Sequence, residues 1–456
     1  MEQKNSRHAL EIRADVCVGC SHCIRVCPTE ALRVVRGKAM LFSDWCVDCG
    51  ECFRVCPSRA IRIADDDINQ IFRYKHRILL IPAIFFGQFE NKISMETITG
   101  LLYEMGFTEV CAVEQGADVL KSELIHYVDT HPKPVISSFC PAVIRIIQVR
   151  FPALVDHIMQ LIPPLEITAR FYMRLFEDKG IPPEDLGIFY VTPCAAKIAA
   201  IKDPVGGYTS PIHGVINMDQ LYNKVYLAYK NKKSGFDSGA VIPVNSALSS
   251  TGVRWTTTGG EARHIKGRAL AIDGMPNVIE FLEKLENEDK EIKDVDFLEL
   301  RVCDESCAGG ILTCGNRFLT VERLKQMEDV LPQKHLYDEK YRKLCSAYIP
   351  MQPIEPRSMI KYDANIKIAL EKMEKARQLK ELLPSIDCGA CGAPSCEALA
   401  EDIVCRNASI NACIFMKTRF EKQGSLSQQS SVEIMEEIWG KERFSDKTKS
   451  DELKKI

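Results

Sequence analysis

Cysteine is the residue type that most constrains the chemistry of this chain. The 456 residues include 20 cysteines, and sixteen of them fall into groups with the spacing of metal ligands. Thiols stay reduced in a long intracellular chain, so clustered cysteines there bind metal more often than they form disulfides. We therefore expect several metal centres with thiolate ligands.

Two of these groups form an internal repeat. Both have the spacing C-x2-C-x2-C-x3-C-P, and VCVGCSHCIRVCPTEAL returns 29 residues later as WCVDCGECFRVCPSRAI. This spacing resembles that of bacterial two-cluster ferredoxins, in which the fourth cysteine of each run ligates the other cluster. The resemblance implies one 4Fe–4S cluster on Cys17, Cys20, Cys23 and Cys56, and a second on Cys46, Cys49, Cys52 and Cys27. A zinc-binding module is the alternative.

Three strand-like apolar segments in the middle of the chain are each followed by one or two cysteines. They are Cys140 in SSFCPAV, Cys194 in YVTPCAAK, and the pair Cys303 and Cys307 in LRVCDESCAGG. A lone cysteine at a strand end is more often a packing residue than a ligand. However, α/β folds build their sites in the loops at the carboxyl ends of strands. Four thiolates from three such loops could hold another 4Fe–4S cluster.

In combination, these segments resemble the H-cluster domain of the iron-only (FeFe) hydrogenases. That family has a Thr-Ser-Cys-Cys-Pro motif, a Met-Pro-Cys-x-x-Lys-x-x-Glu motif and a later Cys-x-x-x-Cys followed by glycines. Here they read SSFCP (137–141), TPCAAKIAA (192–200) and CDESCAGG (303–310). The resemblance implies that the 4Fe–4S part of the H-cluster is held by Cys140, Cys194, Cys303 and Cys307.

The same resemblance assigns roles around a two-iron subsite that carries CO and cyanide ligands. Cys307 would bridge to this subsite, and Lys197 would donate a hydrogen bond to a cyanide, a role that suits a donor-only cation. Pro82 and Ala83, at the end of RILLIPA, would line its other side. The alternative for Lys197 is an ordinary surface lysine.

Several positions depart from the family pattern. Phe139 stands where prototypical enzymes have a cysteine that relays protons, and a benzyl side chain has no exchangeable proton. Positioned acid–base groups contribute about 10²–10⁴ in rate, so turnover should fall by about that much. Ala200 replaces the motif glutamate, and Thr192 and Arg301 replace methionines that pack against the subsite. The expected site keeps the ligands of the cofactor and loses the fast proton path.

A fourth cysteine group lies near the C-terminus, after a helical pattern that breaks at Pro384. It resembles the small 4Fe–4S domain of certain electron-transport subunits and sensory FeFe hydrogenases. The ligands implied are Cys388, Cys391, Cys396 and Cys413, with Cys405 as a competitor and zinc as the alternative metal. The remaining cysteines, interpreted as packing residues, are Cys111, Cys314, Cys345 and Cys405.

Short apolar segments alternate with helical patterns in the middle of the chain. This alternation predicts an α/β fold with parallel sheets and flanking helices in the H-cluster domain, and these elements must position the cysteines. A ferredoxin-like domain precedes it and a small helical iron–sulfur domain follows it. The expected boundaries are 1–73 for the ferredoxin domain, 74–357 for the H-cluster domain, 358–383 for a helical linker, 384–420 for the C-terminal 4Fe–4S domain and 421–456 for a polar tail. The tail has no room for the PAS domain that sensory relatives carry.

The composition of the chain limits which classes of binding partner are expected. The net charge of −3 gives no reason to expect nucleic acid, and no apolar run is long enough to span a membrane. The polar start is unlike a signal peptide, so we expect a cytoplasmic protein. Its substrates would be H2 and protons, and its partner a soluble redox or signalling protein, with a homo-oligomer left open.

Two functions from different classes fit these residues. The first is a sensory or regulatory FeFe hydrogenase that binds hydrogen reversibly, turns over slowly, and passes electrons through three accessory 4Fe–4S clusters. The second is a non-catalytic iron–sulfur protein that resembles the Nar-type assembly proteins and lacks the two-iron subsite. Retention of Lys197 and of the C-terminal cysteine group favours the first.

Overall fold

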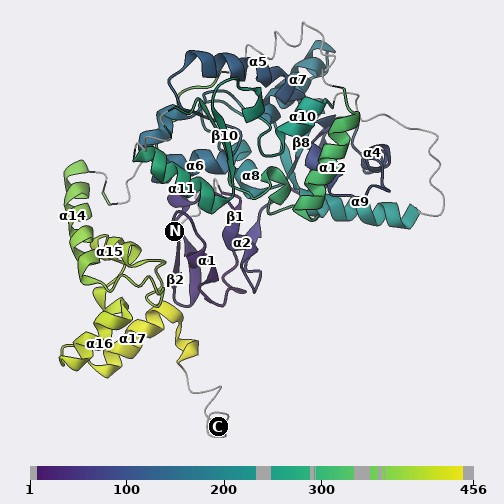
Figure 1. The fold of residues 1–456 in the computed structure, drawn as a ribbon. Helices are drawn as coiled ribbons and strands as arrows, with labels where there is room; N and C mark the ends of the chain where they lie inside the picture. The colour runs from purple at the N-terminus through teal and green to yellow at the C-terminus, as the bar shows by residue number, and fades with distance from the viewer. Residues whose placement is uncertain are drawn as a thin grey trace. The chain divides into compact units, whose positions relative to one another are not determined.

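The structure is a computed structural model, and it describes residues 8–232, 248–287, 292, 294–332, 350–357, 362–363 and 365–444. The chain forms two compact units. The first contains Met1–Ala9 and Ala64–Pro356, and the second contains Leu10–Ile63 and Arg357–Ile456. Each unit is therefore built from segments that are separated in the sequence (Figure 1).

The first unit contains two parallel sheets. The larger has the strand order β6-β5-β8-β9 and the smaller has the order β10-β11-β7. The strands are β5 (His76–Ile81), β6 (Glu109–Ala112), β7 (Val135–Ile136), β8 (Leu186–Thr192), β9 (Gly214–Asn217), β10 (Ala269–Asp273) and β11 (Phe297–Arg301). The three strand-like segments that precede Cys140, Cys194 and Cys303 correspond to β7, β8 and β11, so this prediction is confirmed.

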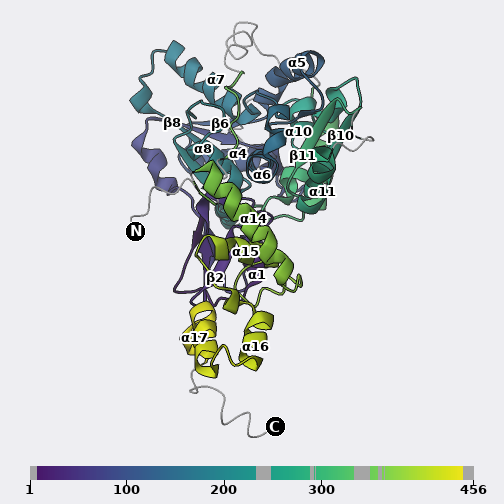
Figure 2. The same ribbon diagram turned by 90° about the vertical axis from the view of Figure 1, so that its left-hand side faces the viewer.

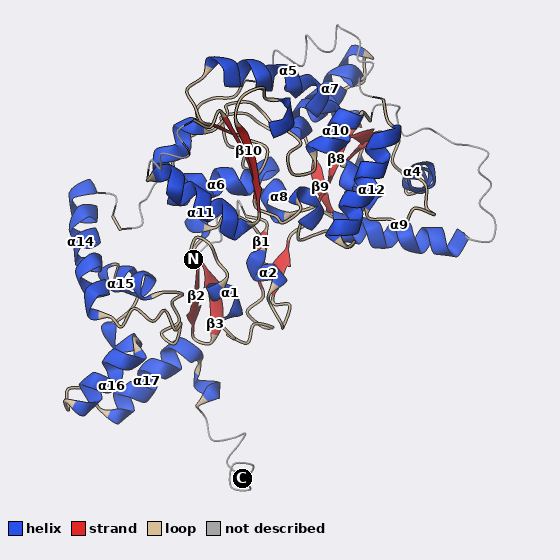
Figure 3. Ribbon diagram, in the orientation of Figure 1, coloured by secondary structure: helices blue, strands red, loops and turns tan. Residues whose placement is uncertain are grey.

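Helices flank both sheets (Figure 3). They are α3 (Ala83–Gly87), α4 (Met95–Glu104), α5 (Gln115–Thr130), α6 (Pro141–Arg150), α7 (Pro164–Asp178), α8 (Ala195–Lys202), α9 (Met218–Lys232), α10 (Ser250–Trp255), α11 (Met275–Glu286) and α12 (Arg317–Val330). The mixed α/β class with parallel sheets and flanking helices was predicted, and the structure has it.

The central strands of the larger sheet are buried on both faces. Ile78 and Leu80 of β5 pack with Tyr172 of α7 in one hydrophobic cluster. The intervening residues Leu79 and Ile81 are also fully buried. Strands covered on both faces are continuously apolar, which is why RILLI does not alternate. The register aligns Leu80 of β5 with Tyr190 of β8, so both strands end on the same edge.

The second unit begins with a small two-layered repeat. Its elements are β1 (Leu10–Ile12), α1 (His22–Arg25), β2 (Leu32–Val35), β3 (Lys38–Leu41), α2 (Glu51–Arg54) and β4 (Ile61–Ile63). β1 pairs with β4 and β2 pairs with β3, both antiparallel. The turn of the β2–β3 hairpin consists of Arg36 and Gly37, which both have positive φ, as a tight hairpin turn requires.

The rest of the second unit is helical. It contains α14 (Ile366–Leu382), α15 (Cys396–Val404), α16 (Ile414–Lys422) and α17 (Gln428–Trp439). α14 lies alongside α15 (Figures 1 and 2), and Ala376 packs with Leu399 and Ile438 in one apolar cluster. α17 thus lies within the polar tail expected at 421–456, and the end of that tail, 445–456, lies outside the described residues.

Candidate metal centres

The eight cysteines of the repeat lie in two groups of four. Burial, with a smaller contribution from the nearby thiolates of Cys17, Cys20 and Cys56, raises the pKa of the Cys23 thiol to about 12. Burial also raises the pKa of Cys46, whose thiolate neighbours include Cys49 and Cys27. These neighbours match the two predicted ligand sets, including the exchange of the fourth cysteine between the repeats. Buried thiols that repel one another as anions are stabilised when a cation binds them.

Backbone amides point at the sulfurs of both groups. Ala31 donates its N–H to Cys27 Sγ and Ala60 donates to Cys56 Sγ, each at 3.2 Å. Ala39 donates to Cys17 Sγ at 3.3 Å and Asp48 to Cys46 Sγ at 3.4 Å. Hydrogen bonds to the cluster sulfurs are one means by which proteins tune iron–sulfur clusters. The donor set therefore fits two 4Fe–4S clusters.

The backbone repeats as faithfully as the sequence. Left-handed φ angles occur at Gly19 and Asp48, and again at Ser21 and Gly50, which occupy equivalent places in the two runs. The same conformation occurs at Glu30 and Arg59. Such angles turn successive N–H groups toward one side of the chain, which is how concave anion sites are made.

In the first unit, three of the predicted ligands lie at element junctions. Cys140 is the N-cap of α6 and Cys194 is the N-cap of α8, and Cys307 lies in the 3₁₀ helix Ser306–Gly309. A helix N-terminus stabilises a thiolate through the helix dipole. Burial raises the pKa of Cys194 to about 11, Lys197 opposes this rise, and the thiolates of Cys307 and Cys140 add to it.

The structure thus brings Cys140, Cys194 and Cys307 together. Cys303 lies on the loop between β11 and this 3₁₀ helix, four residues before Cys307, and is partly buried. Its role as the fourth ligand stays a prediction. This set of thiols fits a third cluster.

A largely apolar pocket lies beside these thiols. The space that no atom fills, including the opening to solvent, is about 930 Å³. Pro82, Phe139, Lys197 and Cys307 line it together, so four of the five residues predicted around the two-iron subsite converge. Ala83, the fifth, donates its N–H to Glu114 Oε1 at 2.6 Å from the start of α3. Cys307, the predicted bridging ligand, is the ligand thiol that borders the pocket.

The ammonium group of Lys197 lies close to both the thiol of Cys307 and the ring of Phe139. Its Nζ lies 3.8 Å from Cys307 Sγ and 4.5 Å from the centre of the Phe139 ring. Burial alone would lower the pKa of Lys197, but the thiolates of Cys307, Cys194 and Cys140 outweigh burial and raise it. The side chain is therefore a cation that faces the pocket, and the alternative of an ordinary surface lysine does not fit.

Arg301 stacks on the ring of Phe139. Its guanidinium carbon lies 3.6 Å from the ring centre, and the side chain is almost fully buried. The register of β11 against β7 explains the contact. Leu298 pairs with Ile136. Arg301, the last residue of β11, and Phe139, in the loop after β7, each lie three residues beyond this pair. A guanidinium is always charged, and its stacking on an aromatic ring is favourable.

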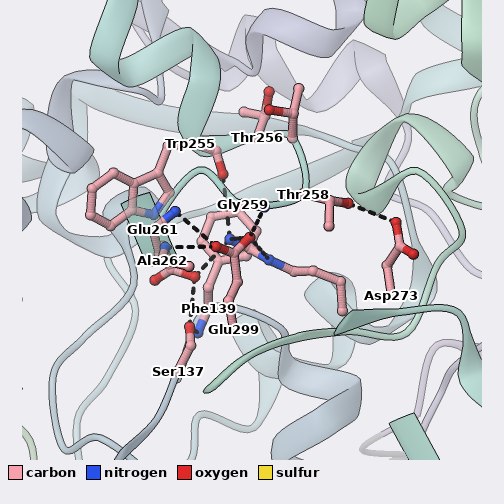
Figure 4. A network of polar contacts seen from close by, with 12 residues as sticks. Ser137, Phe139, Trp255, Thr256, Thr258, Gly259, Glu261, Ala262, Asp273 and Glu299 are labelled. Carbon is pink, nitrogen blue, oxygen red and sulfur yellow. Dashed lines mark hydrogen bonds and ion pairs between the residues drawn. The ribbon is translucent and has the colours of Figure 1, made fainter. Parts of the chain in front are cut away.

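Two buried carboxylates, those of Glu261 and Glu299, belong to one network of polar contacts (Figure 4), and both form ion pairs with Arg301. Arg301 donates to Glu261 Oε2 at 2.7 Å and to Glu299 Oε1 at 3.3 Å. Ser137 also donates to Glu261 Oε2, at 2.7 Å, and accepts the N–H of Phe139 at 3.1 Å. Burial raises the pKa of Glu261, and the charge of Arg301 opposes this rise. The position of the Phe139 ring is therefore fixed in two ways: by the hydrogen bond from the Phe139 backbone to Ser137, and by Arg301, which stacks on the ring.

Backbone amides complete the network around Glu299. Its carboxylate accepts the N–H groups of Gly259, Glu261 and Ala262 at 3.0, 2.9 and 2.9 Å. The sequence analysis missed both glutamates. A signal was present for Glu299, because a glutamate and an arginine two residues apart share one face of an otherwise apolar strand.

Two further acidic residues border the pocket, and the sequence analysis missed them too. Burial raises the pKa of Glu114 to about 8 and that of Glu166 to about 7. Ser210 donates to Glu166 Oε1 at 2.8 Å. Glu114 follows directly after the strand segment EVCAV, and a charged residue at such a strand end was the available signal.

Two other residues that differ from the family motif, Thr192 and Ala200, lie close to the predicted site. Thr192 donates its hydroxyl to the backbone oxygen of Cys194 at 2.8 Å and so shapes the loop that carries this ligand. Ala200 lines the pocket.

The C-terminal cysteines gather at the start of α15. Burial raises the pKa of Cys391 to about 11, and the thiolates of Cys388 and Cys413 contribute. Cys396 is the first residue of α15 and Cys413 is the N-cap of α16. Both side chains are buried in the same apolar cluster. The four predicted ligands are thus consistent with a single metal centre.

The remaining cysteines differ from one another. Cys111 is fully buried in the core, as expected of a packing residue. Cys314 is exposed, so its interpretation as a packing residue is wrong; it lies in the loop before α12, with its Sγ 3.8 Å from the backbone oxygen of Asp219. Cys405 is partly buried at the end of α15, and Cys345 lies outside the described residues.

Comparison with known protein families identifies three segments. Residues 78–223 match the family described as "Iron only hydrogenase large subunit, C-terminal domain". Residues 16–61 match a 4Fe-4S dicluster domain, and residues 383–415 match an Fe-S cluster domain. The chain therefore combines a hydrogenase-type segment with two segments of iron–sulfur type. No curated protein matches the sequence.

Solved structures of FeFe-hydrogenases are similar to the chain at low sequence identity. A variant of HydA1 from Chlamydomonas reinhardtii has 16% identity and a TM-score of 0.46, over 62% of this chain and 94% of that chain. The FeFe-hydrogenase HydA(deltaEFG) has 15% identity and a TM-score of 0.43, over 67% and 93%. None of the helices that the structure describes is long and apolar enough to cross a membrane.

Proposed function

We propose that this chain is a regulatory FeFe hydrogenase that binds H2 reversibly and oxidises H2 or reduces protons slowly. The observation that carries the proposal is the wall of the pocket beside Cys307. There the ring of Phe139 lies between the cations of Lys197 and Arg301. The match of residues 78–223 to the iron-only hydrogenase family supports the same class of activity.

The residues at and beside the pocket have the following parts in this proposal. Cys140, Cys194, Cys303 and Cys307 would hold the 4Fe–4S part of an H-cluster, and Cys307 would also be a ligand of a two-iron subsite with CO and cyanide ligands. Lys197 would donate to an anionic ligand in this largely apolar pocket, where a charge-assisted hydrogen bond is strong. Pro82 also lines the pocket and has no backbone N–H to donate. The bound cofactor supplies the chemistry of hydrogen binding and electron exchange.

Phe139 accounts for the slow turnover. A thiol in its place could give and take a proton at the pocket, whereas the benzyl ring cannot. Arg301, stacked on the ring, cannot serve either, because a guanidinium does not release its proton in proteins. The residues next to the ring therefore position the cofactor and exclude water without moving protons rapidly, which suits a protein that senses hydrogen.

Electrons would leave through the second unit. Its twelve predicted ligand cysteines would hold three accessory 4Fe–4S clusters, and a soluble redox or signalling protein of the cytoplasm would be the partner. Both the dicluster match and the C-terminal Fe-S match support this part.

The test is an infrared spectrum of the full-length protein after maturation with the two-iron cofactor. CO and cyanide give bands in a region free of protein absorption, and these bands should appear and shift when H2 is admitted. Absence of the bands after maturation would contradict the proposal and would favour a non-catalytic iron–sulfur protein of the Nar type. Lys197→Ala should still load the 4Fe–4S clusters but change the cyanide bands.

A further inference from the structure

The C-terminal cysteine module packs on the ferredoxin-like repeat within the second unit. Val34 of β2 donates its N–H to the backbone oxygen of Gly392 at 2.8 Å. Arg36 and Gly37, in the hairpin turn, donate to Glu437 and Ile438 at 2.7 and 2.9 Å. The edge of the β2–β3 hairpin is thus paired with backbone that lies more than 350 residues further along the chain.

A buried ion pair fixes this contact. Arg33 Nε lies 2.5 Å from Asp402 Oδ2, and Nη2 lies 3.2 Å from Oδ1. Both side chains are less than a tenth exposed. A bidentate guanidinium–carboxylate pair of this kind constrains orientation as well as distance. Separation of the modules would break this pair together with the backbone hydrogen bonds of the hairpin edge.

The ligand loops of two predicted clusters approach each other at this contact. A Cβ on Gly389, which follows Cys388, would lie 3.8 Å from Ile24 Cδ1, and Ile24 follows Cys23. Gly392, which follows Cys391, would place a Cβ 2.4 Å from the backbone oxygen of Val34. Only glycine allows so close an approach.

A second line of contacts joins the same two loops. A Cβ on Gly19 would lie 2.3 Å from the backbone oxygen of Gly37, and one on Gly37 would lie 2.6 Å from that of Trp439. The indole of Trp439 donates to the backbone oxygen of Ala390 at 2.9 Å. Arg443 donates to the backbone oxygen of Gly19 at 3.1 Å. A continuous packed path therefore runs from the loop Cys17–Cys20 through Trp439 to the loop Cys388–Cys391.

We propose that the C-terminal 4Fe–4S cluster is the direct redox neighbour of the cluster on Cys17, Cys20, Cys23 and Cys56. One electron would leave one cluster and reduce the other, with no proton or bond exchanged. This inference rests on the cluster ligands assigned under the proposed function, but it requires neither hydrogen nor the two-iron cofactor. Electron tunnelling falls steeply with distance, so packed ligand loops favour this pair.

Electron paramagnetic resonance of the full-length, dithionite-reduced protein tests the proposal. Cys49→Ser removes the second cluster of the repeat and leaves the proposed pair, whose spectrum should show broadening and fast relaxation from spin–spin coupling. Cys20→Ser is the matched control. It removes the first cluster instead, and the two accessory clusters that remain, the second cluster of the repeat and the C-terminal cluster, should give narrower, slowly relaxing signals. The iron content of each variant establishes which cluster was lost.

Two outcomes would overturn the inference: magnetically isolated clusters in Cys49→Ser, or stronger coupling in Cys20→Ser. A C-terminal module without iron in every preparation would also overturn it. Because cysteine variants can misfold, Asp402→Ala provides a second test that keeps all ligands. It should weaken the coupling seen in the otherwise unaltered chain, whereas Glu397→Ala, at an exposed position of the same helix, should not.

Discussion

At the scale of single residues, Phe139 connects the sequence of the pocket to its chemistry. The ring is held by its own backbone bond to Ser137 and by Arg301 at 3.6 Å. Arg301 in turn is held by Glu261 and Glu299. The substitution of phenylalanine for a thiol is thus accompanied by a buried cation in contact with the ring, so the pocket wall is built around the aromatic side chain.

Phe139→Cys restores an exchangeable proton at this wall. In the fully matured protein, H2 oxidation should rise by about 10²–10⁴, the contribution of a positioned acid–base group. Phe139→Leu is the control, because it removes the ring without adding a thiol, and its rate should not rise. Equal rates in the two variants would show that the missing thiol does not limit turnover. The measurement is H2 uptake with an artificial electron acceptor.

Arg301→Ala removes the cation from between two buried carboxylates. Breaking a buried ion pair by deleting one partner costs about 3–5 kcal/mol, because the other partner keeps its charge without compensation. Thermal unfolding should therefore occur at a clearly lower temperature. Arg174→Ala, which removes an exposed ion pair with Glu177, should change the stability by no more than about 0.5 kcal/mol. Equal effects of the two variants would contradict the role given to the network.

At the scale of elements, the parallel strands bring the chemistry together. β5 and β8 end side by side, and this edge delivers Pro82 and Cys194 to the same region. In the smaller sheet β7 pairs with β11, which ends at Arg301, and Phe139 follows three residues after the end of β7. Helices α6 and α8 begin at the ligands themselves, so two helix N-termini stabilise thiolates.

Glu114, between β6 and α5, makes the stability of the folded state depend on pH. Burial raises its pKa from 4.5 to about 8, so the folded state binds a proton that the unfolded state has released. The stability from this group is complete below about pH 4.5 and is lost as the pH rises through about 8, with a slope of at most about 1.4 kcal/mol per pH unit. Glu166 acts with the same sign.

Glu114→Gln keeps an oxygen that can accept the N–H of Ala83 and cannot ionise. The unfolding temperature of the variant should therefore fall less between pH 5 and pH 8 than that of the original protein. Glu96→Gln, at an exposed position of α4, should leave the pH profile unchanged. Parallel profiles for Glu114→Gln and the original protein would contradict the buried, protonated state of Glu114.

The elements were more predictable from sequence than the network between them. The segments RILLI and GIFYVT are continuously apolar, and both became buried parallel strands. The cysteine spacing also predicted which thiols lie together in the repeat. In contrast, Glu261 contacts Arg301 from a loop 40 residues away, and a separation of 369 residues divides Arg33 from Asp402. Such pairs depend on tertiary packing, which local pattern does not encode.

At the scale of the whole molecule, the chain divides the expected metal centres between its two units. The unit of Ala64–Pro356 carries the four cysteines predicted to ligate the H-cluster, and the unit built from Leu10–Ile63 and Arg357–Ile456 carries the other twelve predicted ligands. The joint packing of the N-terminal and C-terminal segments was not expected, since the sequence separates them by the entire H-cluster domain. The predicted domain boundaries themselves stay predictions.

The central claim, a complete H-cluster site together with three accessory clusters, is tested most directly by the iron content of the full-length protein. Four 4Fe–4S clusters contain sixteen irons by their composition, and a two-iron subsite adds two more. Protein made without the maturation of the two-iron cofactor should contain about sixteen irons per chain, and the same protein after maturation about eighteen. An iron content that does not increase on maturation would contradict the account and leave a non-catalytic iron–sulfur protein.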